Sequence, residues 1–390
     1  MKSRFIAIGV GQGDAFFLEK RAGFAALVDG GGSVAGFAAE FQRATQRDSV
    51  DAVICTHNDA DHANGVIGFL QQGLRCKEVW LPASWTDRLR DLFRPEEFTR
   101  EIVDDVMKLG EREDSNVQQG DTLLERLAER HEANQVGNTQ ETLGTENLVE
   151  GCLEASGEEH IGLWHYLLLY WHPDWPFFWP RLWADDPRFR LFVEAIAAGD
   201  RIRQIARLAF HRGCRIRWFE YSSSNASGGN RGVLVPVNAR EVREVTVNKS
   251  SALMYLALSI ANRQSLVFCS SPDGTAPAIL FTADSDLSFA NPVPWSYGMI
   301  VTAPHHGSEA NAKAYERFHR EMRNSTSTAW VRSDGKFRSR PGKSFLDLQA
   351  SNVPVFCTLC RHASQPKQDL VFTMRCQRWN PVNARACLCR

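Results

Sequence analysis

The chain has 390 residues, of which 43% are hydrophobic and 23% charged, and this is the composition of a globular protein rather than of a disordered, collagen-like or coiled-coil chain. A formal net charge of -1 excludes a uniformly basic nucleic-acid-binding protein, and ten cysteines are too few for a disulfide scaffold. No clean apolar stretch reaches the roughly 18 residues of a membrane span, and no signal-peptide pattern follows the basic start. We therefore expect a cytoplasmic protein with reduced thiols and no membrane span.

Both ends of the chain predict strands and helices separated by glycine turns. Apolar runs predict strands at 5–10, 15–19, 25–28, 52–55, 251–260, 278–282, 299–302, 330–331 and 353–356. Helices are predicted over 36–43, 66–71, 310–322 and 344–350. This alternation is typical of an α/β protein.

The middle of the chain, 86–234, differs from both ends. Residues 86–110 predict helix with a break at Arg94-Pro95, and an acidic, polar stretch predicts a mobile loop over 132–159. The aromatic-rich stretch 164–183 predicts either a buried helical core or a surface that binds a protein partner. We therefore expect a mostly helical insertion here.

Two segments of the chain contain an excess of positively charged residues. Residues 201–250 contain 10 Lys and Arg against 3 Asp and Glu, and residues 311–345 contain 9 against 3. These cations either contact phosphates of a substrate or form a solvated face that pairs with the acidic stretch 101–160.

The strongest chemical signal directly follows the predicted strand 52–55. His57, Asp59, Asp61 and His62 place four metal-binding side chains within six residues, on a turn between a buried strand and an apolar helix. Imidazole suits zinc, iron or nickel, and carboxylates admit harder ions such as manganese. The cluster predicts a metal site.

Two more predicted strands end in the same chemistry. The strand at 278–282 leads to Asp284, and the strand at 299–302 leads to His305 and His306. A carboxylate and imidazoles at strand ends are what a two-metal site needs to activate water and to stabilise charge on a phosphoryl group.

These residues carry a resemblance to a known family. The run His57-x-Asp59-x-Asp61-His62 resembles the His-x-His-x-Asp-His signature of the metallo-β-lactamase superfamily, in the variant typical of its ComEC-like branch. Segments 10–15, 247–253 and 305–308 also resemble that branch, in its order. The resemblance covers 1–85 and 235–362 and leaves the insertion 86–234 and a Cys-rich tail, 363–390, outside.

The resemblance implies an αββα sandwich with a large helical insertion and two divalent ions, zinc or manganese, at one sheet edge. His57 and Asp59 would bind one ion, and Asp61 and His62 the second. Asp284 would bridge the ions, and His305 or His306 would complete the second site. Supporting hydrogen bonds to the ligands would come from Gln12 and Asp14, with Asp29 near the same edge.

The sequence departs from the family at three places. The separate histidine of the family's third motif has no clear counterpart in this sequence. The Gly that precedes the bridging acid in the family is Ala283 here, and a later Gly-His-Pro reads Ser339-Arg340-Pro341. Arg340 either binds a substrate phosphate bidentately or marks a weakened metal site.

The leading functional hypothesis is a metal-dependent hydrolase, a phosphodiesterase or nuclease that uses a metal-activated water. Its predicted catalytic residues are Asp61, Asp284 and Arg340. Its predicted phosphate-binding residues are Arg215, Arg217, Arg338 and Arg340, and the expected partner is nucleic acid or another phosphodiester. The alternatives are a small-ester hydrolase with the insertion as a lid, and a catalytically weakened interaction or regulatory protein.

Five cysteines near the end of the chain form a separate motif. They are Cys357, Cys360, Cys376, Cys387 and Cys389. Their irregular spacing predicts either a structural zinc site or reduced thiols that merely pack.

Overall fold

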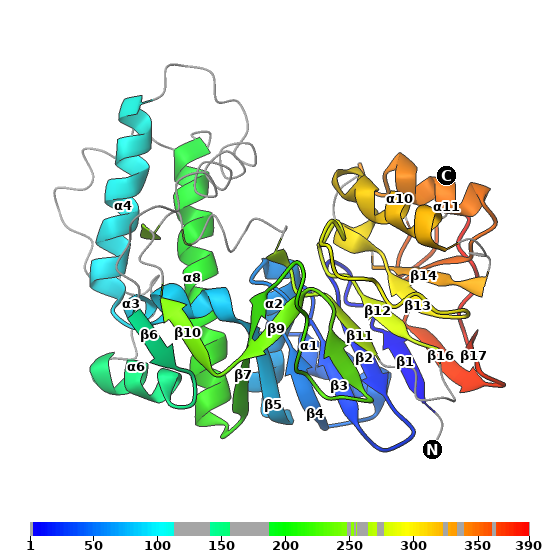
Figure 1. Cartoon of the computed structure of the whole chain (residues 1–390), viewed down its shortest axis with the longest axis horizontal. Helices are drawn as coiled ribbons and strands as arrows, with labels where there is room; N and C mark the ends of the chain where they lie inside the picture. The colour runs from blue at the N-terminus through cyan, green and yellow to red at the C-terminus, as the bar shows by residue number, and fades with distance from the viewer. Residues whose placement is uncertain are drawn as a thin grey trace. The chain divides into compact units, whose positions relative to one another are not determined.

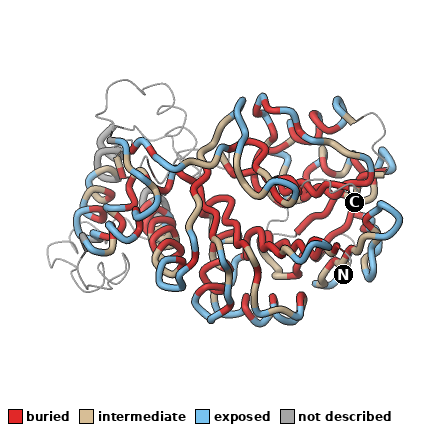
Figure 2. The backbone as a smooth tube through the Cα atoms, turned by 60° about the horizontal axis from the view of Figure 1, so that its bottom comes forward, coloured by how far each residue is buried: buried red, intermediate tan, exposed pale blue. Residues whose placement is uncertain are grey.

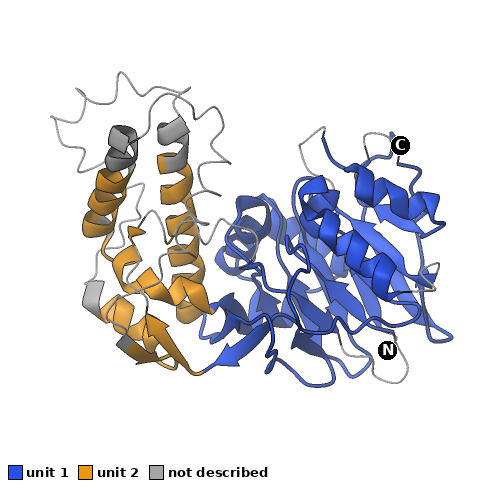
Figure 3. Cartoon of the chain, turned by 45° about the horizontal axis from the view of Figure 1, so that its top comes forward, with its two compact units in different colours: residues 1–82, 212–242, 262–390 blue, residues 83–211, 243–261 orange. Residues whose placement is uncertain are grey.

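The computed structural model describes residues 3–112, 141–156, 187–247, 251–252, 255, 264–270, 277–322, 327–333, 339–360 and 364–389. The chain divides into two compact units (Figure 3). Unit 1 comprises residues 1–82, 212–242 and 262–390, and unit 2 comprises residues 83–211 and 243–261.

The larger sheet of unit 1 has nine strands in the order β17-β16-β1-β2-β3-β4-β5-β7-β9 (Figure 1). Their bounds are β1 Arg4–Ala7, β2 Phe16–Glu19, β3 Ala25–Val28, β4 Ser49–Ile54, β5 Arg75–Pro82, β7 Arg215–Tyr221, β9 Ala239–Val242, β16 Leu370–Arg375 and β17 Arg378–Pro381. Strands β3, β4, β5 and β7 are parallel, so their carboxyl ends lie at one edge of the sheet.

The smaller sheet of unit 1 has six strands in the order β15-β14-β13-β12-β11-β8. Their bounds are β8 Leu234–Pro236, β11 Phe268–Ser270, β12 Ile279–Phe281, β13 Ile300–Thr302, β14 Ala329–Arg332 and β15 Val355–Cys357. Strands β12 to β15 are parallel to one another, so this sheet also gathers several carboxyl ends at one edge.

The two sheets bury one hydrophobic core between them. Phe5 and Phe16 of the larger sheet both contact Phe281 of the smaller one, with ring centroids 6.1 Å apart in each pair. Trp80 contacts Phe268 in the same way, at 5.6 Å. Figure 2 shows long buried stretches of the chain in the interior. Because side chains alternate across a strand, the opposite faces of both sheets need a second cover.

Helices provide that cover. Helices α1 (Phe37–Thr45) and α2 (Ala60–Gln71) pack on the outer face of the larger sheet, where Phe41 contacts both Phe17 and Phe69. Helices α10 (Ala312–Glu321) and α11 (Lys343–Ala350) pack on the smaller sheet, where Phe318 contacts Trp330 at 5.2 Å. The result is an αββα sandwich, and this confirms the predicted fold class.

Unit 2 is mostly helical over its described residues. It contains η1 (Ala83–Arg88), α3 (Leu89–Leu92), α4 (Pro95–Arg112), α6 (Leu148–Ser156) and α8 (Pro187–His211), with a two-stranded sheet of β6 (Glu141–Gly144) and β10 (Glu244–Val247). The predicted break at Arg94-Pro95 separates α3 from α4. Arg88 holds these elements together through ion pairs with Asp91 and Glu101.

Two secondary-structure predictions in this unit are wrong. Residues 141–156 form β6 and α6 where a mobile loop was predicted over 132–159, because Leu143 pairs with Val245 and the apolar side chains around Val149 are buried. Residues 252 and 255 are helical rather than part of a strand, and the Tyr255 hydroxyl donates to the Trp85 carbonyl at 2.9 Å. The remainder of 132–159 and the stretch 164–183 lie outside the described residues.

The predicted boundaries also differ from the observed units. Strand β7 lies in the nine-stranded sheet, although 86–234 was predicted as insertion, because its backbone pairs with β5 and β9. Strands β16 and β17 belong to the same sheet, although 363–390 was predicted as a tail. Charged residues interrupt the apolar residues of β7 (RIRWFEY), which hides this strand from a hydrophobicity pattern. Strand β16 (LVFTMR) has an apolar run that was visible in the sequence and was not assigned.

Among the described helices, none combines the length and the apolar character needed to cross a membrane.

Candidate metal centre

Three strand ends supply the predicted metal ligands. Strand β4 leads through Thr56 into the turn that carries His57, and strand β12 leads to Asp284. Strand β13 leads to η5 (Pro304–Gly307), which carries His305 and His306. The site therefore combines loops from both sheets of unit 1.

The start of α2 fixes the spacing of the first ligands. Asp59 is the N-cap residue, and its carbonyl accepts hydrogen bonds from the amides of His62 and Ala63 at 3.0 and 2.8 Å. Asp61 and His62 consequently lie in the first helical turn. The carboxylate of Asp61 is also favoured there by the positive end of the helix dipole.

One group of ligands surrounds Asp284. The Nε2 atom of His62 lies 3.2 Å from Asp284 Oδ1, and Nε2 of His57 lies 3.6 Å from Asp284 Oδ2. All three side chains are buried, and their ligand atoms lie within 4.8 Å of one another. The His57 Nε2 atom also lies 3.6 Å from Asp59 Oδ2. Asp284 therefore joins His57 and His62 in one group, and its bridging role stays a prediction.

A second group joins Asp61, His62 and His306, whose ligand atoms also lie within 4.8 Å of one another. The Nε2 atom of His306 lies 3.1 Å from Asp61 Oδ2, and its Nδ1 atom lies 3.2 Å from Asp14 Oδ1. His306, rather than His305, is thus the histidine that faces Asp61. Asp14 contacts the candidate ligand His306, and its supporting role stays a prediction.

Asp29 contacts both Thr56, which precedes His57, and the candidate ligand His62. Its Oδ1 accepts a hydrogen bond from the Thr56 amide at 2.9 Å, and its Oδ2 accepts one from Thr56 Oγ1 at 2.7 Å. The same Oδ2 lies 2.9 Å from Nδ1 of His62, so the other ring nitrogen of His62 faces Asp284. Such contacts fix the orientation of a ligand ring.

Opposite charges dominate the electrostatics of the cluster. Burial and the neighbouring His62 lower the pKa of His57, but Asp284 and Asp59 together more than offset this, and the pKa rises to about 9. Burial likewise lowers the pKa of His306, while Asp14 raises it to about 10. Burial raises the pKa of Asp284, and the imidazole of His305 with its neighbours holds it well below its usual range. A divalent cation would replace protons as the counter-charge of these carboxylates.

The chemistry of the donor set fits divalent ions. Nε2 of His57 and Nε2 of His62 are buried and make no hydrogen bond to the described part of the chain. Buried polar atoms in native proteins nearly always have a partner, and imidazole nitrogens facing carboxylate oxygens form a mixed donor set that suits zinc or manganese.

Arg340 lies at the rim of this cluster, beside His305. Its Nη2 lies 2.5 Å from Nε2 of His305, and that same ring nitrogen lies 3.6 Å from Asp284 Oδ2. Gln12 contributes a backbone contact, because its carbonyl accepts a hydrogen bond from the Gly32 amide at 3.1 Å.

The other predicted phosphate-binding arginines lie elsewhere. Arg217 is bound by Glu78 at 2.9 Å and by Glu241 at 2.5 Å, and its guanidinium stacks on Trp80. Two carboxylates already neutralise the charge of Arg217, and this corrects its prediction as a phosphate-binding residue. Arg215 is exposed at the amino end of β7, the end opposite to the metal ligands. Arg338 lies outside the described residues.

Sequence reasoning missed Thr56, whose hydroxyl joins Asp29 to Nδ1 of His57 at 3.0 Å. Its position between a buried strand and the first ligand was the available signal.

Of the five predicted zinc-binding cysteines, Cys357, Cys360, Cys387 and Cys389 gather in the fold. Cys376 is exposed in the turn between β16 and β17 and does not join them, which corrects the five-residue set.

Comparison with known proteins agrees with this geometry. The family model for the metallo-beta-lactamase superfamily matches residues 8–111, a range that includes the turn from His57 to His62. No curated protein matches the sequence. Residues 8–111 therefore match the metallo-beta-lactamase superfamily, whose members are typically hydrolytic metalloenzymes.

Proposed function

We propose that this chain is a metal-dependent phosphodiesterase. The observation that carries the proposal is the guanidinium of Arg340 beside His305, at the rim of a buried cluster of histidines and aspartates. A guanidinium offers a planar pair of donors that matches two oxygens of a phosphate, and it stays charged at any physiological pH. A cation at this position favours an anionic substrate over a neutral ester.

The ligands have distinct roles in this proposal. His57, His62 and Asp284 would hold one ion, and Asp61 with His306 would hold the second. Two such ions, when bound, lower the pKa of a water and stabilise charge on the attacking and leaving oxygens of a phosphoryl group. Arg340 would orient the non-bridging phosphate oxygens, and the buried walls around Asp284 would limit competing water.

The test begins with protein stripped by a chelator and reloaded with manganese, zinc or magnesium. Hydrolysis is measured on bis-p-nitrophenyl phosphate, on p-nitrophenyl acetate, and on end-labelled single-stranded DNA and RNA. We expect diester hydrolysis that depends on metal. Asp284→Asn should lower kcat by about 10²-fold or more, which is comparable to losing a main electrostatic stabiliser of a transition state.

Arg340→Ala separates a phosphodiesterase from an esterase. We expect it to lower kcat/KM for the diester more than for the acetate ester, whereas Arg75→Ala serves as a matched control because Arg75 is exposed at the amino end of β5. Equal losses on both substrates, or hydrolysis of the acetate alone, would favour the small-ester hydrolase. Metal-loaded protein that cleaves none of these substrates would favour the weakened interaction protein.

Nucleic acid and small diesters differ in their response to salt. Binding of a polymer that contacts several phosphates weakens steeply as salt rises, with a slope of about 0.7 for each contact to a single strand. A small diester makes one phosphate contact and shows little slope. Binding measured over a salt series therefore decides which kind of phosphodiester the site accepts.

A further inference from the structure

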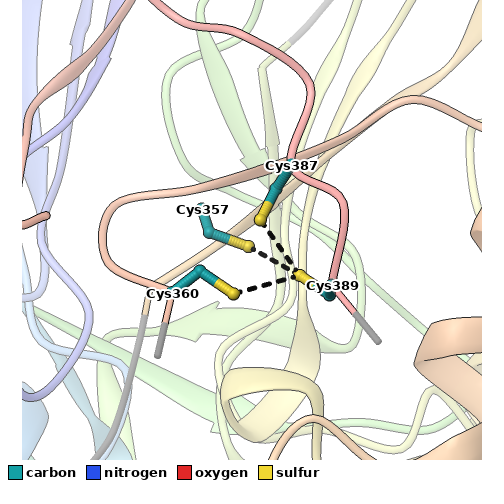
Figure 4. A group of neighbouring side chains, drawn as sticks. All are labelled: Cys357, Cys360, Cys387 and Cys389. Carbon is teal, nitrogen blue, oxygen red and sulfur yellow. Dashed lines mark hydrogen bonds between the residues drawn. The ribbon is translucent and has the colours of Figure 1, made fainter. Parts of the chain in front are cut away.

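Four cysteines meet at the end of the smaller sheet and form a group that shares no residue with the histidines and aspartates described above (Figure 4). Cys357 ends strand β15, and Cys360 follows in the next turn. Cys387 and Cys389 come from the C-terminal segment, and all four side chains are buried. Residues about 30 positions apart in the chain therefore share one buried site.

The sulfur positions match a single tetrahedral ion better than disulfides. The Sγ atom of Cys389 lies 3.4 Å from those of Cys357 and Cys360 and 3.2 Å from that of Cys387. A disulfide needs two sulfurs at about 2.05 Å, and it would leave the other two cysteines without a role in the cluster. Zinc–sulfur bonds of about 2.3 Å in a tetrahedron would place the sulfurs about 3.8 Å apart.

A buried arginine supports the same conclusion. The Nε atom of Arg332 donates to Sγ of Cys357 at 3.4 Å, and the arginine side chain is fully buried. Four thiolates around a divalent ion carry a net charge of about -2, and a charged hydrogen-bond donor beside one of them offsets part of it. The same guanidinium donates from Nη2 to the Leu359 carbonyl at 3.5 Å, which holds the charged donor beside the cysteines.

We propose that Cys357, Cys360, Cys387 and Cys389 bind one structural Zn²⁺ ion. Four sulfur ligands leave no open coordination position, so the site is closed to substrate and its role is to stabilise the fold. The proposal is independent of the phosphodiesterase activity, because none of these cysteines belongs to the candidate catalytic cluster.

The position of the site explains what the ion would stabilise. The amide of Cys387 donates to the carbonyl of Val355 at 2.7 Å, so the C-terminal segment already pairs with β15 at the edge of the smaller sheet. Between Cys360 and Cys387 the chain forms β16 and β17, the last two strands at one edge of the larger sheet. An ion held by both pairs of cysteines would therefore tie together the edges of the two sheets.

The test compares the full chain with two single variants. Elemental analysis should show that Cys389→Ser loses one equivalent of zinc, whereas Cys376→Ser keeps it, because Cys376 is exposed outside the cluster. Cobalt substituted into the chain should give the intense visible bands of tetrahedral thiolate coordination. These bands should persist in Asp284→Asn, which separates this site from the catalytic one.

A second measurement applies if Cys389→Ser fails to fold. Blocking the thiols of the intact native chain with an organic mercurial, in the presence of a zinc-sensitive dye, should release zinc. The proposal is overturned if no zinc is released, if Cys389→Ser keeps its full zinc content, or if iron replaces zinc in the purified protein. A disulfide at Cys389 found by mass spectrometry without reduction would also overturn it.

Discussion

At the scale of single residues, Asp29 fixes the orientation of the His62 imidazole ring. Its carboxylate receives hydrogen bonds from the amide and the hydroxyl of Thr56 and contacts Nδ1 of His62, all from a position behind the ligands. Asp29 itself adopts a left-handed backbone conformation with φ of 58°. In the proposed site Asp29 is therefore a positioning residue, because it would act on a bound metal through His62 rather than by direct contact.

This role predicts a defined effect of Asp29→Ala. Without the carboxylate, the His62 ring loses its fixed orientation, and metal affinity should fall by about 10- to 100-fold. Competition with a chromophoric chelator measures that affinity. Asp48→Ala is the control, because Asp48 pairs with Arg75 at the protein surface. Unchanged affinity in Asp29→Ala would show that His62 is oriented by other contacts.

The residue scale also shows where sequence reasoning succeeds and fails. Four potential ligands within six residues are visible in any reading of 57–62, because their spacing is local. The partners of Arg217 cannot be recognised in the sequence, since Glu78 is 139 positions away and Glu241 is 24 positions away. A basic segment predicts phosphate contacts only while its charges lack such partners, and these appear only in the folded chain.

At the scale of elements, two glycines let the loop after β3 approach helix α2 closely. A Cβ atom added at Gly65 would lie 1.8 Å from the carbonyl oxygen of Gly30, and one added at Gly30 would meet Gly65 and Val66. Gly30 follows β3 directly after Asp29, and Gly65 lies in α2. This contact therefore fixes the distance between Asp29 and the helix that carries Asp61 and His62.

Two glycine-to-alanine substitutions in helices should consequently act in opposite directions. Gly65→Ala should lower the free energy of unfolding by about 1–3 kcal/mol, since backbone must move to admit the methyl group. Gly151→Ala in α6 should raise it by about 0.5–1 kcal/mol, because nothing lies within 4 Å of the added Cβ and alanine favours helix. Urea unfolding checks both values. A stabilised Gly65→Ala variant would show that the two backbones are not in close contact.

The elements that the sequence predicts well are those with uninterrupted apolar runs. Strand β3 begins and ends where the pattern places it, at Ala25 and Val28. Strands β5 and β7 were missed, because charged residues such as Lys77 and Arg217 interrupt their apolar residues. Parallel pairing with neighbours buries these strands, and such pairing cannot be read from a local pattern.

At the scale of the whole molecule, the candidate metal site exists only once both sheets of unit 1 have packed. His57, Asp61 and His62 follow a strand of the larger sheet, whereas Asp284 and His306 follow strands of the smaller one. The family match ends at residue 111 and so covers only the first set. The sequence identified both sets, but the choice of His306 over His305 beside Asp61 follows from the packing of η5.

The most direct test of this account is the metal content of the purified chain and of two matched variants, measured by elemental analysis. We expect about two divalent ions in the histidine and aspartate cluster of the wild type, besides the zinc of the cysteines. Asp284→Asn should lose at least one of them, whereas Asp286→Asn should lose none, because Asp286 faces Lys313. A wild type that takes up no metal at this cluster, or an Asp284→Asn variant with full metal content, would contradict the account.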